Sequence, residues 1–287
     1  MKRLLPIITF IAAVFITAGC STTRVLQDGE YRLARNRIII EDSKEFNVNK
    51  LEPYLKQKPN SYFIFGWNPF LSVYNWSNGK GKAWDKFVQK IGVAPVVYDP
   101  DMVDGSIDNL KSHLNYLGYY GSHITSEISV KKKRVEVTYN VDLGKRLPIK
   151  DIVYDLPERG PFAEAFLGDT SSMTVRKGDW LSEAALDAET VRSSAVLRNQ
   201  GFYNFNKNYY FFEADTLSSP DSAILQLTIN EYTRNESPRD AKPIRKFYID
   251  DVSISYPKSL KFRDKVLKDL TTIYPGQVYS ADAVNKT

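Results

Sequence analysis

Two short stretches decide the fold: Leu-Gly-Tyr-Tyr at residues 117–120 and Asn-Gln-Gly-Phe-Tyr at residues 199–203. Each follows a segment whose apolar residues recur at helical spacing, and each places a glycine where that helix has to end. Glycine adopts the positive φ of a helix exit at little cost, and the next aromatic side chain can then fold back onto the helix. The two stretches therefore predict the same local structure twice: a helix, a glycine stop and the start of a strand.

The segments around the second stretch complete a β-α-α-β-β unit. Alternating apolar residues predict the strands. Pro161 at one helix start and Ser182 as the N-cap of the other predict the helices, and Gly201 ends the longer helix. The predicted elements are strands at residues 147–154, 203–212 and 223–229, and helices at residues 161–167 and 182–200.

The first stretch belongs to a unit that ends in the same way. A helix through Leu110 and Leu114 stops at Gly118, and a hairpin follows around the basic residues 131–133. The expected elements are strands at residues 37–41, 123–130 and 134–141, and a helix at about 49–56. An aromatic insertion at about 58–98 separates the two helices of this unit. We expect it to pack as an additional helical layer, and an exposed binding surface is the alternative.

A third unit begins near Phe247. Residues 249–257 parallel residues 149–157, and residues 276–280 parallel residues 178–182. In the second unit the helix-ending Gly201 follows Gly178, and the same interval counted from Gly276 passes Thr287. The third unit is therefore expected to be cut inside its second helix, and the chain to be a fragment of a longer protein or the product of a truncated gene.

The amino terminus has the pattern of an export signal. Lys2 and Arg3 precede an apolar run at residues 4–18, which is shorter than the about 20 residues that span a bilayer. Residues 17–20, Thr-Ala-Gly-Cys, resemble a bacterial lipobox, although Thr17 stands where leucine is usual. A plain secretory signal or a signal anchor is the alternative.

Cys20 is the only cysteine, so the chain has no partner for an intramolecular disulfide, and lipid attachment explains the lone thiol of an exported protein. We expect residues 1–19 to be removed, residues 20–30 to be a tether, and the lipid on Cys20 to hold the protein to a membrane. Ser21 in place of Asp favours the outer membrane, by resemblance to the bacterial sorting rule.

The repeated units resemble POTRA (polypeptide-transport-associated) domains. The resemblance implies an α+β fold in which each unit is a three-stranded sheet with two helices on one face. Behind an export signal, such units resemble the periplasmic arm of BamA/TamA-type outer-membrane assembly factors, closest to the TamA-like lipoprotein of Bacteroidetes. The expected domains are residues 31–145, 146–233 and 245–287.

The same resemblance implies a non-enzymatic scaffold for unfolded or nascent outer-membrane proteins, with a TamB-like periplasmic partner. In this family pattern the first strand of each hairpin is a sheet edge, to which an extended polypeptide can add by β-augmentation. The candidate partner-binding residues are His123, Thr125, Glu127, Tyr203, Tyr209 and Phe211. The alternative is that a neighbouring unit covers each edge.

Other functions have little support in the sequence. The net charge of +5 falls to +3 when Lys2 and Arg3 leave with the signal, which is mild and gives no nucleic-acid footprint. Two histidines with one cysteine offer no conventional zinc site. No nucleophile motif or P-loop is present, so no catalytic residue or cofactor is expected. The arm of a polypeptide-secretion pore and a lipid-anchored envelope enzyme remain alternatives. The basic residues 131–134 fit either anionic headgroups or a solvated turn.

Overall fold

The computed structural model describes residues 22–41, 46–61, 68–255, 257, 266–267 and 271–287. The predicted signal at residues 1–19, the lipid site at Cys20 and residues 62–67 of the aromatic insertion lie outside the described residues. Among the helices that are described, none is both long enough and apolar enough to cross a membrane.

The chain divides into two compact units. The first comprises Met1–Leu114 and Gly121–Gly144, and the second comprises Asn115–Tyr120 and Lys145–Thr287. Residues 115–120, which contain the first helix-stop stretch, therefore belong to the second unit. The domain limits drawn from the sequence stay predictions.

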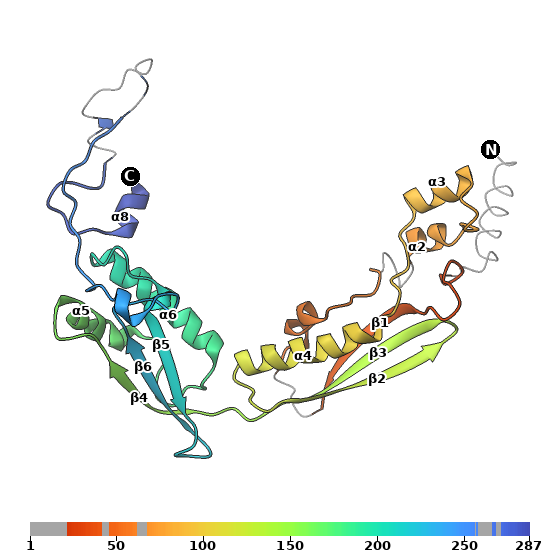
Figure 1. The fold of residues 1–287 in the computed structure, drawn as a ribbon, viewed down its shortest axis with the longest axis horizontal. Helices are drawn as coiled ribbons and strands as arrows, with labels where there is room; N and C mark the ends of the chain where they lie inside the picture. Colours follow the sequence, from red (N-terminus) through yellow and green to blue (C-terminus); the bar gives the residue numbers. More distant parts are fainter. Residues whose placement is uncertain (1–21, 42–45, 62–67, 256, 258–265, 268–270) are drawn as a thin grey trace, which may run out of the picture. The chain divides into compact units, whose positions relative to one another are not determined.

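The first unit is built on a sheet with the strand order β1-β3-β2 (Figure 1). Strand β1 (Arg32–Ile40) runs parallel to β3 (Arg134–Asp142), and β2 (His123–Lys131) runs antiparallel to β3. Alternate residues of β3 are buried because one face of the sheet packs against α4 (Pro100–Tyr116), which contributes Leu110 and Leu114. The predicted hairpin and the helix before Gly118 are confirmed.

The helix predicted at about 49–56 is wrong. Two short 3-10 turns occupy this segment, η1 (Val48–Lys50) and η2 (Glu52–Tyr54). Pro53 has no backbone N–H to donate, so an α-helix cannot continue through it. Leu51 and Leu55 are nevertheless buried. The apolar spacing that predicted a helix therefore places core side chains on two successive turns. The described part of the insertion forms helices, as expected: α2 (Pro69–Tyr74) and α3 (Ala83–Ile91).

The second unit repeats this plan with the strand order β4-β6-β5. Its helices lie on one face of the sheet (Figure 1). The core is largely aromatic, with Phe162, Phe166, Phe202 and Phe205 packed around Tyr210. The elements are β4 (Ile149–Asp155), α5 (Pro161–Asp169), η3 (Thr170–Ser172), α6 (Glu183–Asn199), η4 (Lys207–Tyr209), β5 (Tyr210–Asp215) and β6 (Ala223–Ile229). The α+β class with three-stranded sheets is confirmed.

The strand predicted at residues 203–212 is wrong at its start, because β5 begins at Tyr210. Phe202 and Phe205 are both fully buried. Two buried residues that are three positions apart suit a turn, because residues on one face of a strand are two apart. The Asn206 side chain then accepts a hydrogen bond from the Asn208 N–H and starts η4. Side chain–backbone bonds of this kind compete with strand formation.

The parallel between the second and third repeats extends to their hydrogen bonds. The three bonds around Ile149 are Ile149 N to Asp179 O (2.8 Å), Gly178 N to Ile149 O (2.8 Å) and Leu181 N to Leu147 O (2.8 Å). Those around Ile249 are Ile249 N to Gln277 O (2.8 Å), Gly276 N to Ile249 O (2.7 Å) and Tyr279 N to Phe247 O (3.0 Å). Ser182 caps α6, and Ser280 caps α8 (Ala281–Lys286), each through its hydroxyl. Residues 247–249 and 276–280 thus repeat the hydrogen-bond arrangement of residues 147–149 and 178–182.

Candidate polypeptide-binding edges

Strand β2 turns the backbone groups of its even-numbered residues away from the sheet. The Arg32 N–H donates to the Lys133 oxygen at 2.9 Å, so Lys133 faces β1 and the next residue, Arg134, faces β2. Lys132 and Lys133 have φ of 51° and 56°, the two-residue turn in which the flanking residues 131 and 134 form a hydrogen-bonded pair. Because paired residues alternate along an antiparallel ladder, Ser126 and Ile128 present their N–H and C=O groups outward.

The outward-facing residues of β2 also carry exposed apolar side chains. Ile124 is buried on the helix-covered side of the sheet, and Ile128 and Val130 follow it on the same side by two-residue alternation. Ile128 is nevertheless 50% exposed and Val130 is 54% exposed. A strand added beside β2 would cover both side chains while it pairs with the backbone. No described strand occupies that position.

Strand β5 is the corresponding edge of the second unit. The Ala223 N–H donates to the Pro148 oxygen at 3.0 Å, so alternation turns the backbone groups of residues 211, 213 and 215 towards β6. Phe212 and Ala214 therefore present theirs outward. Tyr210 does so too, but its oxygen accepts a bond from Arg234 Nε at 2.8 Å. Arg234 thus occupies the beginning of this edge and leaves the rest open.

A groove of about 720 Å³ lies between α6 and β5. Its apolar lining includes Leu181, Leu186, Phe212 and Leu225, and its polar lining includes Glu183, Asp187, Glu213 and Arg234. The three carboxylates are on exposed residues, so the groove combines an apolar floor with a mostly acidic rim. This arrangement suits an extended peptide that pairs with β5 and directs alternate side chains into the groove.

Of the six predicted site residues, some lie on the strands β2 and β5 and others precede β5. His123, Thr125 and Glu127 lie on β2, but their backbone groups face β3, and Glu127 accepts a bond from Asn140 Nδ2 at 3.0 Å. Only Phe211 of the other three lies on β5, where it contacts Tyr232.

Tyr203 and Tyr209 precede β5. Tyr203 packs edge-on against Tyr279, and Tyr209 stacks on Phe205. The residues that sequence reasoning missed are Ser126, Ile128, Phe212, Ala214 and Arg234. The length of the hairpin turn could reveal Ser126 and Ile128, because the two turn residues Lys132 and Lys133 fix which residues pair. The predicted strands instead leave residues 131–133 between them.

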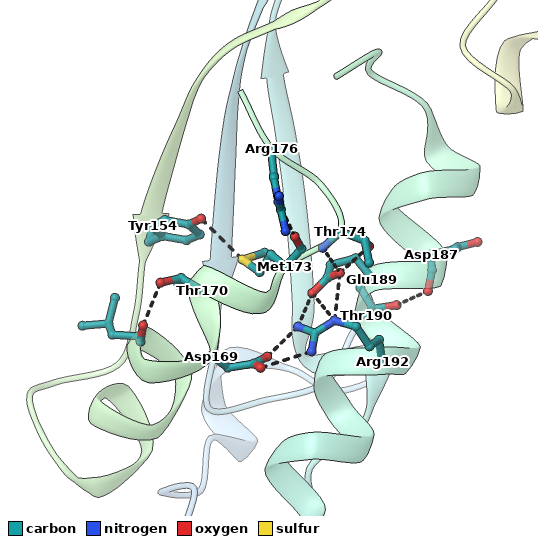
Figure 2. A network of polar contacts seen from close by, with 11 residues as sticks. Tyr154, Asp169, Thr170, Met173, Thr174, Arg176, Asp187, Glu189, Thr190 and Arg192 are labelled. Atoms are coloured by element: carbon teal, nitrogen blue, oxygen red, sulfur yellow. Dashed lines mark hydrogen bonds and ion pairs between the residues drawn. The ribbon is translucent and has the colours of Figure 1, made fainter. Parts of the chain in front are cut away.

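A polar cluster with two buried carboxylates, Glu189 and Asp169, lies between α5 and α6 (Figure 2). The Arg192 guanidinium, on α6, bonds to Glu189 Oε1 at 2.6 Å and to Asp169 Oδ1, at the end of α5, at 3.1 Å. Glu189 Oε2 also accepts from the Thr174 N–H at 2.8 Å. These bonds tie α6 to α5 and to the turn that follows it, so the cluster is structural.

Electrostatics agree with a structural role for this cluster. Burial opposes ionisation of Glu189, but the hydrogen bonds from Arg192 and Thr174 outweigh it and hold the pKa of Glu189 below its ordinary value. The hydrogen bonds of Arg192 to Glu189 and Asp169 raise the pKa of Arg192, so both Glu189 and Arg192 stay charged. Within the described part of the chain, no group of His, Cys, Asp or Glu is arranged to hold a metal ion.

Comparison with solved structures finds low similarity in sequence. The POTRA3-5 structure of Haemophilus influenzae BamA is 12% identical, with 91% of this chain and 85% of that chain covered and a TM-score of 0.39. The amino-terminal domain of Omp85 from Thermosynechococcus elongatus is 11% identical, with 69% and 66% covered and a TM-score of 0.25. CdiB from Escherichia coli is 10% identical, with 74% and 29% covered and a TM-score of 0.25.

The family comparison is specific to one part of the chain. No curated protein matches the sequence. Residues 35–144 match the family model described as POTRA, surface antigen variable number repeat. The matched range runs from β1 to the residues just after β3 and includes the hairpin and its exposed edge. The match to the POTRA family thus lies within the first unit.

Proposed function

We propose that this chain is a non-enzymatic periplasmic scaffold that binds extended segments of client or partner polypeptides during outer-membrane protein assembly or translocation. The observation that carries the proposal is the edge of β2, where the outward backbone groups of Ser126 and Ile128 lie beside exposed apolar side chains. Exposed strand edges bind other strands through their unpaired N–H and C=O groups. The POTRA match at residues 35–144 supports the same role.

Binding of this kind tolerates many client sequences. The backbone supplies the hydrogen bonds, so recognition by β2 depends on the client being extended, with apolar side chains that cover Ile128 and Val130. At β5 the acidic residues Glu183, Asp187 and Glu213 add a preference for clients with basic side chains next to apolar ones.

The proposed setting is the outer membrane, with the chain lipid-anchored through Cys20 and facing the periplasm. The clients are unfolded or nascent outer-membrane proteins, and a TamB-like protein is the proposed periplasmic partner. The lone Cys20 at the end of the signal-like segment supports the anchor. The resemblance of the sequence to the TamA-like lipoprotein of Bacteroidetes supports the same setting.

A proline at Ser126 tests the edge. Ser126→Pro removes an outward N–H while the bonds of Thr125 and Glu127 to β3 remain, and proline is tolerated at such edge positions. A photocrosslinking residue at Thr125 should capture client polypeptides in cells with the original chain and with Ser126→Ala. With Ser126→Pro the crosslinks should be lost. Crosslinks that persist in a correctly folded Ser126→Pro protein would exclude β2 as the binding edge.

A further inference from the structure

The helices α2 and α3 form a hairpin that is held together from its inner side. Asp85 is buried, and its carboxylate accepts bonds from the Asn78 N–H at 2.7 Å and the Ser77 hydroxyl at 3.1 Å. Gln89 Nε2 donates to the same Ser77 hydroxyl at 3.0 Å. Val88, one turn after Asp85, is buried as well. One side of α3 is therefore fully engaged with the loop and helix before it.

The other side of α3 exposes large apolar side chains. Trp84 is 54% exposed and Phe87 is 55% exposed, and their ring centroids are 5.8 Å apart. Ile91, one turn further on, is exposed as well. Residues 84, 87 and 91 recur at helical spacing, so these side chains form one stripe along α3. Because the inner contacts fix the helix, this exposure is a stable feature of the fold.

The charges around the stripe have one sign. Residues 61–98 contain four lysines, at positions 80, 82, 86 and 90, and a single carboxylate, Asp85. All four lysines are exposed, whereas Asp85 is buried and faces inward. Lys82, Lys86 and Lys90 recur every four residues and follow α3 beside the aromatic stripe. The outer surface of the hairpin is thus apolar and purely cationic.

We infer that α3 docks on the surface of an anionic lipid bilayer, with Trp84, Phe87 and Ile91 in the interfacial layer. Interfacial helices combine lysines on the polar side with Trp and Phe on the apolar side, and tryptophan favours the headgroup level. Lysine is depleted at protein–protein interfaces, so a stripe flanked by three lysines fits a membrane better than a protein partner. The lysines would pair with lipid phosphates, and the hairpin would hold the first unit against the bilayer. This role is independent of the strand edges.

Quenching of tryptophan fluorescence by brominated lipids tests the inference. The full chain is reconstituted in vesicles of phosphatidylethanolamine and phosphatidylglycerol, with and without bromine on the acyl chains. Trp84→Phe should lose most of the quenching, and its matched control, Trp180→Phe in the second unit, should retain it. Every variant keeps residues 1–21, so any anchoring there is the same throughout. Trp84 is exposed and phenylalanine is a conservative replacement, so the fold should persist, which near-ultraviolet circular dichroism verifies.

A charge reversal supplies the second arm. Lys86→Glu combined with Lys90→Glu should reduce the quenching, and the same charge change at the exposed Lys150 and Lys207 should not. Equal quenching of the Trp84→Phe and Trp180→Phe proteins would overturn the inference. So would capture of an envelope protein by a photocrosslinker at residue 87 without lipid quenching, since the stripe would then be a protein interface. Ser126→Pro should leave the quenching unchanged, so failure of the edge proposal is distinguishable from failure here.

Discussion

Arg234 Nε donates a hydrogen bond to the backbone oxygen of Tyr210 at 2.8 Å, and this single contact closes the first outward position of the β5 edge. The open part of β5 therefore starts at Phe212. Within the described residues, no comparable side-chain bond closes the edge of β2. That edge runs over nine residues, from His123 to Lys131. Of the two edges, β2 is thus the longer surface for an added strand.

Removing the Arg234 side chain should lengthen the β5 edge. In Arg234→Ala the Tyr210 oxygen becomes available to a bound strand, so an extended peptide should bind more tightly to the second unit. The lost bond is partly exposed and should cost about 1 kcal/mol of the free energy of unfolding. Peptide titration and urea unfolding measure the two effects. Weaker peptide binding would show that Arg234 contacts the peptide directly.

Breaking the buried cluster should be far more costly. Arg192→Met leaves the carboxylates of Glu189 and Asp169 buried without their cation, and we expect a loss of about 3 kcal/mol in the free energy of unfolding. Arg159→Met, at an exposed position, should change it by less than about 0.5 kcal/mol. Urea unfolding of both variants is the measurement. Equal stability would mean that the cluster does not hold α5 and α6 together.

The same cluster should make the protein sensitive to acid. Glu189 has a pKa below its ordinary 4.5 in the folded protein, so its ionised form stabilises the fold at any pH above that value. This contribution should disappear as the pH falls through the lowered pKa. The free energy of unfolding, followed from neutral pH down to acid pH, should therefore decrease more steeply for the original chain than for Glu189→Gln. Parallel pH profiles would contradict the assignment.

Two glycines with positive φ allow the cost of backbone strain to be measured separately from the cost of lost packing. Gly201 has a φ of 107°, and a Cβ atom there would approach Lys246 Cγ to 2.7 Å and Val278 Cγ1 to 2.9 Å. Gly178 has a φ of 92° and no atom within 4 Å of the same position. Gly178→Ala should cost about 1 kcal/mol in the free energy of unfolding, through the backbone alone. Gly201→Ala should cost more and loosen the chain around Lys246 and Val278, as hydrogen exchange would show. Equal costs would mean that this packing contributes nothing.

Local signals in the sequence predicted much of the fold. The glycines at 118 and 201 do adopt positive φ, and Ser182 does cap its helix. The errors came where tertiary burial overrides a local pattern. Phe205 falls inside the strand predicted at residues 203–212, although it lies in a turn before β5 and is buried with Phe202 in the core. Pro53 converts an apolar helical spacing into two turns.

The sequence predicts less of the candidate site than of the fold. The choice of β2 and β5 as edges agrees with the strand orders. The side of each strand that is open depends on pairing, and pairing is fixed by contacts between distant residues such as Arg32 and Lys133. A shift of one residue exchanges the outward and inward backbone groups. The sequence therefore predicts odd-numbered binding residues on β2, whereas the even-numbered ones face outward. Arg234 lies outside the predicted strands, and no sequence pattern linked it to Tyr210.

Amide hydrogen exchange on β2 tests the central claim most directly. The full chain is measured alone and with a synthetic peptide. The peptide copies a β-strand of an outer-membrane protein that the photocrosslinking residue in place of Thr125 captures. Exchange at the outward amides of Ser126 and Ile128 should slow when the peptide binds, while the amides of Thr125 and Glu127, already paired with β3, should change little. A bound peptide that leaves the exchange of Ser126 and Ile128 unchanged would contradict strand addition at this edge.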